Sequence, residues 1–69
     1  MTAIENLRAN VNFVTKYGRG WGDLVAAAQA VTNHLPSTDD FKKSVTHTVR
    51  TGHGLGVVLT NAQKFLASA

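Results

Sequence analysis

The chain has 69 residues, enough for one domain whose own core is marginal, because a domain of this size buries only about 60 % of its unfolded surface. It contains no cysteine, so disulfides and thiolate zinc sites are excluded. The formal net charge is +3 with only 16 % of residues charged, which permits an acidic partner without the dense basic patch typical of nucleic-acid-binding domains. Small domains without disulfides or metals are often completed by a partner, so we expect oligomerisation or docking on another surface.

The first predicted helix begins after Thr2. Thr2 and Glu5 have the spacing of a capping box, in which each side chain bonds the other residue's backbone N–H. Ile4, Leu7, Val11 and Val14 follow at intervals of three and four residues, which indicates one apolar helical face.

The second predicted helix begins near Asp23 and carries apolar residues from Leu24 to Leu35. Pro36 ends it, because proline removes a backbone donor and clashes with the preceding turn. Ser37 or Thr38 is then expected to cap a third helix. Asp39 and Asp40 fall in its first turn, where the helix dipole favours acids. Its apolar stripe consists of Phe41, Val45 and Val49.

The third segment has an alternative interpretation. Residues 44–51, "SVTHTVRT", are rich in β-branched residues, which favour a strand, so a strand–loop–helix organisation of each half stays open. The last predicted helix carries Val58, Ala62, Phe65 and Leu66 on its apolar face.

An internal repeat relates the two halves of the chain. When the sequence is aligned with itself so that Gly18 falls on Gly52, the two glycine triplets coincide, as do the flanking pairs Leu7 and Phe41, and Val11 and Val45. We call this the repeat alignment. The triplets are Gly18, Gly20 and Gly22, and Gly52, Gly54 and Gly56.

A repeat of this length usually marks one supersecondary unit. We therefore predict a single all-α domain over residues 1–69, with four short amphipathic helices in two similar helix–GxGxG–helix hairpins, about residues 2–35 and 36–69, completed by oligomerisation.

The glycine triplets have three interpretations. A dinucleotide-binding loop needs G-x-G-x-x-G, but Asp23 and Val57 occupy the sixth positions and no G-K-[ST] follows, so nucleotide binding is not expected. Glycines in the left-handed conformation could end each first helix, and this turn is the favoured interpretation. Alternatively the helices continue, and glycines four apart form a smooth face for close helix packing.

No constellation for catalysis or metal binding is recognisable. His34, His47 and His53 have no histidine four residues away, and the four acids are all accounted for by helix starts. We therefore expect no enzyme activity, no cofactor and no metal site.

Two sets of residues are candidates for contacts with a partner. The first set supplies apolar and small interface positions: Gly18, Gly20, Trp21, Gly22, Gly52, Gly54, Gly56, Leu7, Val11, Phe41, Val45 and Phe65. It fits a non-enzymatic amphipathic protein that forms a homo- or hetero-oligomer or docks on a partner, in a membrane-associated or channel-forming assembly. The second set is basic: Lys16, Arg19, Lys42, Lys43 and Arg50. It fits the alternative function, a soluble adaptor or regulator that binds an acidic protein or a nucleic acid, the nucleic acid being the less favoured partner.

The stretch from Asn12 to Val31, "NFVTKYGRGWGDLVAAAQAV", resembles the short α-helical porin subunits of the corynebacterial mycolate outer membrane. The resemblance implies a bacterial cell-envelope location, and acylation at Ser68, since some members are mycoloylated on serine. Those subunits lack a cleaved signal, and no secretory signal or spanning segment is recognisable here. Without the resemblance the expected location is the cytoplasm. The basic charge and the internal repeat depart from the family's pattern.

Overall fold

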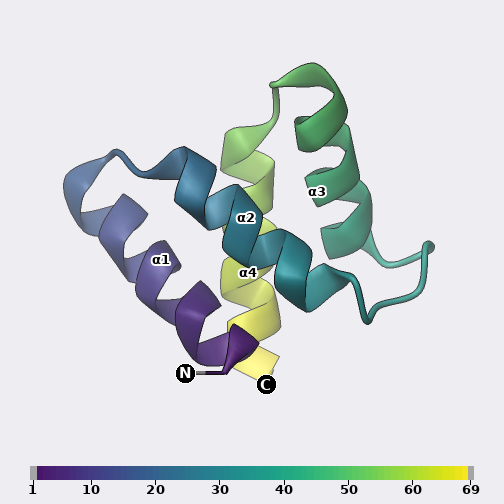
Figure 1. Ribbon diagram of the computed structural model, residues 1–69, viewed down its shortest axis with the longest axis horizontal. Helices are drawn as coiled ribbons and strands as arrows, with labels where there is room; N and C mark the ends of the chain where they lie inside the picture. Colours follow the sequence, from purple (N-terminus) through teal and green to yellow (C-terminus); the bar gives the residue numbers. More distant parts are fainter. Residues whose placement is uncertain (1, 69) are drawn as a thin grey trace.

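The computed structural model describes residues 2–68, and this range contains four α-helices and no strand (Figure 1). The helices are α1 (Ala3–Tyr17), α2 (Trp21–Thr32), α3 (Asp40–Thr51) and α4 (Leu55–Ser68). The prediction of an all-α fold with four helices is therefore confirmed. The strand alternative for residues 44–51 is wrong, because Phe41, Val45 and Thr48 lie at helical spacing on the face of α3 that is buried.

The helix starts follow the sequence with one correction. The Thr2 hydroxyl accepts a hydrogen bond from the Glu5 N–H at 3.1 Å, so the predicted capping box is present. The cap of α3 is Asp39, whose carboxylate accepts from the Phe41 N–H at 2.9 Å, and not Ser37 or Thr38. The reason lies in the preceding loop, since the Asp39 N–H bonds the Pro36 carbonyl at 3.0 Å and this turn places Asp39 at the helix entrance.

The second helices of the two halves form the centre of the domain. α2 and α4 contact each other and both flanking helices, whereas α1 and α3 lie on opposite sides (Figure 1). Leu7, Leu24 and Val58 are the largest fully buried side chains. The remaining buried hydrophobic residues are Val11, Val14, Ala27, Ala28, Val31, Phe41, Val45 and Ala62. All four helices thus contribute to one core.

Buried positions of the first half recur in the second half under the repeat alignment. The matched buried pairs are Leu7 and Phe41, Val11 and Val45, Val14 and Thr48, Leu24 and Val58, and Ala28 and Ala62. Equivalent positions of the two halves therefore face the core.

Both glycine stretches form turns, and the helices do not continue through them. Gly18 and Gly52 end α1 and α3 with φ of 70° and 76°, each donating its N–H to the carbonyl four residues earlier at 2.8 Å. Gly20 and Gly54 also have positive φ, 87° and 86°. The left-handed conformation is disfavoured for residues with a Cβ, which explains the glycines at these places.

The second glycine of each turn also allows a close approach to the preceding helix. A Cβ on Gly20 would lie 3.0 Å from Phe13 Cδ1, and one on Gly54 would lie 3.5 Å from His47 Cδ2. Phe13 and His47 correspond in the repeat alignment, so the two turns pack alike. By contrast, no atom lies within 4 Å of a Cβ built on Gly22 or Gly56, which belong to the first turns of α2 and α4.

We expect Leu24→Ala to lower the free energy of unfolding by about 2–5 kcal/mol, because it removes buried contacts and leaves a cavity at a fully buried position. Val57→Ala is the control, since that side chain is 55 % exposed, and its effect should stay within about 0.5 kcal/mol. Chemical denaturation followed by circular dichroism measures both. Equal stability of the two variants would contradict this core.

The turn geometry predicts opposite effects of alanine at two neighbouring glycines. Gly18→Ala places a Cβ at φ 70° and should destabilise the fold by about 1–2 kcal/mol. Gly22→Ala, in open space in the first turn of α2, should stabilise it by up to about 1 kcal/mol. Both changes restrict the unfolded chain alike, so the difference in denaturation midpoint reports the native conformation. Equal midpoints would argue for a helix that continues through Gly18.

Candidate functional site

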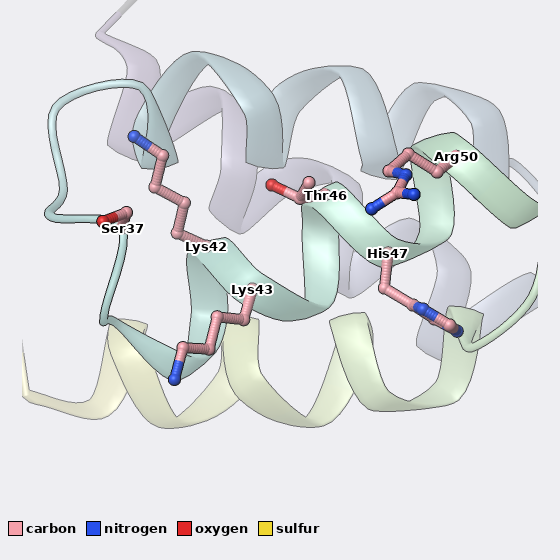
Figure 2. Close-up of a pocket in the computed structure, with 6 residues that line it drawn as sticks. All are labelled: Ser37, Lys42, Lys43, Thr46, His47 and Arg50. Carbon is pink, nitrogen blue, oxygen red and sulfur yellow. The ribbon is translucent and has the colours of Figure 1, made fainter.

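The outer side of α3 carries a cluster of basic and polar residues. Phe41, Val45 and Thr48 bury the inner side of this helix, and the residues between them consequently face outward. We call the outward set the α3 basic face: Lys42, Lys43, Thr46, His47 and Arg50. With Ser37 from the preceding loop, these residues line an open hollow of about 260 Å³ (Figure 2).

The α3 basic face consists of two rows of side chains. Figure 2 shows Lys42, Thr46 and Arg50 projecting to one side of α3, and Lys43 and His47 to the other. The first row also borders a second hollow, of about 210 Å³, between the end of α2 and α3. Its other lining residues are Gln29, Thr32, Asn33, Val45 and Val49. Neither hollow is lined by a carboxylate from the described part of the chain, so the local potential is positive.

Of the three cations on the α3 basic face, Lys42 has a structural task. The Lys42 ammonium donates a hydrogen bond to the Leu35 carbonyl at 3.0 Å, which ties the start of α3 to the turn after α2. Lys43 and Arg50 are exposed, as are Thr46 and His47. Lys43 and Arg50 are therefore the side chains that can reach a ligand without breaking a bond of the fold.

The acids lie at helix starts, as the sequence predicted. Glu5, Asp23 and Asp40 are in the first turns of α1, α2 and α3. Asp39 caps α3, and with Asp40 it lines a separate hollow that includes Lys64 of α4. Asp40 is thus the acid closest along the helix to the α3 basic face.

The other two predicted basic contacts lie at the end of α1, in a different environment. We call Phe13, Lys16, Tyr17 and Arg19 the aromatic corner. The Phe13 and Tyr17 ring centroids are 4.7 Å apart. Lys16 Nζ lies 5.4 Å from the Tyr17 centroid and Arg19 Cζ lies 6.0 Å from the Phe13 centroid, within the range of cation–π attraction. The five predicted cations therefore divide between two surfaces.

The predicted apolar interface residues lie mostly inside the chain. Leu7, Val11, Phe41 and Val45 are buried in its own core. The remaining two large residues are partly buried: Phe65 contacts Phe41 with the rings tilted and their centroids 5.5 Å apart, and Trp21 packs against the core. The glycines are turn or first-turn residues. Leu7, Val11, Phe41 and Val45 are therefore occupied within the folded chain, and an interface through the other predicted positions stays a prediction.

The remaining candidate residues are dispersed. Ser68 is exposed at the end of α4, where its hydroxyl donates to the Lys64 and Phe65 carbonyls at 3.2 Å each. Within residues 2–68 no group of three His, Cys, Asp or Glu side chains could hold a metal ion. No helix in this range has the length and apolar character needed to cross a membrane.

Sequence reasoning missed three residues at the hollow: Ser37, Thr46 and His47. The signal was available, because residues 42, 46 and 50, and residues 43 and 47, have the four-residue spacing of one helical surface. The stacked pair Phe13 and Tyr17 has the same spacing.

Comparisons of the chain with protein-family models, with curated proteins and with solved structures found no match.

Proposed function

We propose that this protein is a small non-enzymatic docking module that binds an acidic macromolecule, a nucleic acid or an acidic protein, through the α3 basic face. The observation that supports the proposal is the grouping of Lys42, Lys43 and Arg50 around hollows that no described carboxylate lines. A surface of one charge sign attracts and steers partners of the opposite sign.

The packing of the apolar stripes favours this function over assembly through those stripes. Leu7, Val11, Phe41 and Val45 are used within the chain, so they offer no area to a second subunit while the domain is folded. An adaptor needs only a stable scaffold and one exposed recognition surface. Channel formation and acylation of Ser68, which the porin resemblance implies, stay predictions.

The double variant Lys43→Gln/Arg50→Gln should weaken binding to an acidic partner by about tenfold or more at low salt, because both exposed cations leave the α3 basic face. The measurement is fluorescence anisotropy with two labelled probes, a mixed-sequence DNA duplex and poly-glutamate. We expect the unmodified chain to bind at least one of the two probes.

The matched control is Arg8→Gln/Lys64→Gln, which removes the same charge from α1 and α4. It should change the affinity by less than about twofold, apart from a general effect of net charge. Equal losses in the two double variants would contradict a defined site on α3. Thermal unfolding of each variant verifies that the fold is intact.

A second candidate function is peripheral attachment to an anionic membrane through the aromatic corner. Phe13 and Tyr17 are 41 % and 53 % exposed, and Lys16 and Arg19 accompany them. Aromatic rings beside cations suit the headgroup region of a bilayer.

For this candidate we expect Tyr17→Ser to reduce co-sedimentation with vesicles rich in phosphatidylglycerol. Val57→Ser is the matched control, because Val57 is similarly exposed at 55 % but lies at the start of α4. Its bound fraction should remain that of the unmodified chain. If the unmodified chain sediments no better with phosphatidylglycerol than with phosphatidylcholine vesicles, this candidate function is excluded.

A further inference from the structure

We infer that the acidic macromolecule is a nucleic-acid duplex and that α3 lies in its major groove. This inference rests on the proposed function and specifies the partner of the same surface. It is supported by the spacing of the cations along α3, the polar residues between them, and the position of α3 at the side of the domain.

The cations of the α3 basic face lie at both ends of the helix. Lys42 and Lys43 precede Arg50 by eight and seven residues, which corresponds to about 10–12 Å along the axis at about 1.5 Å per residue. A helix that lies along the major groove has one wall of phosphates on each side. Lys42 and Arg50 project to one side of α3 and Lys43 to the other (Figure 2), so the cations can reach phosphates on both walls.

The residues between the cations carry neutral hydrogen-bonding groups. Thr46 and His47 are exposed in the middle of the face, and a hydroxyl and an imidazole can bond base edges or bridging water. Asn33 and Gln29 add amide groups along the adjoining hollow, and Ser37 adds a hydroxyl beside Lys42. Along α3, Thr46 and His47 thus lie between Lys43 and Arg50, so their hydrogen-bonding groups can meet base edges while the cations hold phosphates.

The place of α3 in the fold leaves this face accessible. Within residues 2–68, α3 packs on α2 and α4 and makes no contact with α1, so it forms one side of the domain (Figure 1). An α-helix with side chains is about 10–12 Å across, which is the width that the major groove admits.

Other acidic partners fit this face less well. A protein interface is usually anchored by buried aromatic or large apolar side chains, and a bilayer requires apolar side chains that insert. Among the described residues that line the two hollows, Val49 is the one large apolar side chain that is mostly exposed, at 52 %. A polar, cationic and wet surface is the composition of protein–DNA interfaces.

Asp40 sets a limit on one end of the face. It is exposed in the first turn of α3, three residues before Lys43, and repels a nearby phosphate. Asp40→Asn should therefore increase the affinity for a duplex by about two- to threefold, and the effect should shrink with added salt.

The test compares a mixed-sequence DNA duplex, one of its single strands and poly-glutamate as labelled probes for the unmodified chain. We expect the duplex to bind most tightly, and dimethyl sulfate to modify guanine N7, a major-groove atom, less in the complex than in free DNA. Tighter binding of the single strand or of poly-glutamate would overturn the inference, as would unchanged reactivity at N7.

Two variants separate the contacts to phosphates from those inside the groove. Lys43→Gln/Arg50→Gln should reduce the slope of log affinity against log salt by about 1.8, at about 0.9 for each phosphate contact. Thr46→Ala/His47→Ala, measured where histidine is neutral, should lower duplex affinity about three- to tenfold with the slope unchanged. If Thr46→Ala/His47→Ala has no effect on affinity, α3 does not enter the groove.

The docking function and the assignment of a nucleic-acid duplex as partner can be contradicted separately. The unmodified chain could bind poly-glutamate at least as tightly as the duplex and lose this binding in Lys43→Gln/Arg50→Gln. That result would support the docking function and overturn the nucleic-acid assignment. Failure of the unmodified chain to bind any of the three probes at low salt would overturn both.

Discussion

The central position of α2 and α4 is the constraint on which the rest of the fold depends. These two helices supply Leu24, Ala28, Val58 and Ala62, all with no exposed surface, and both contact α1 and α3. Because α3 is held against this central pair through Phe41 and Val45, its remaining side chains must face outward. The outward position of the α3 basic face is therefore a consequence of the core.

Local signals in the sequence were sufficient for the helices and turns. The capping box at Thr2 and the left-handed glycines at positions 18 and 52 are determined by neighbouring residues, so they could be predicted. The end of α2 and the start of α3, on the two sides of Pro36, were harder to predict. α2 stops at Thr32, and the loop's own hydrogen bonds select Asp39 as the cap. β-branched residues in α3 suggested a strand, but burial at helical spacing outweighed that propensity.

The candidate site was less predictable, because it depends on which side of α3 is buried. Thr48 occupies a core position that a purely apolar pattern overlooks, and its hydroxyl donates to the His53 carbonyl at 2.8 Å. Because Thr48 is buried, Thr46 and His47 face outward on the same surface as the cations. Lys16 and Arg19 looked equivalent to the cations of α3 in the sequence, yet they lie beside Phe13 and Tyr17 at the end of α1. The five predicted cations thus lie on two surfaces, the α3 basic face and the aromatic corner, because of the tertiary packing.

The two halves share their buried positions and the basic pairs Arg8/Lys42 and Lys16/Arg50, but their outer surfaces differ at other positions, and this difference bears on function. In the repeat alignment, the α1 counterparts of the α3 basic face are Arg8, Ala9, Asn12, Phe13 and Lys16. An alanine thus stands where α3 has Lys43, and an exposed aromatic ring stands where it has His47. Since both helices pack on the same central pair, the scaffold itself does not require a basic outer face. Lys43 and Arg50 are exposed and contribute little to packing, so the proposed recognition of an anionic partner would give them a physical role that the core does not.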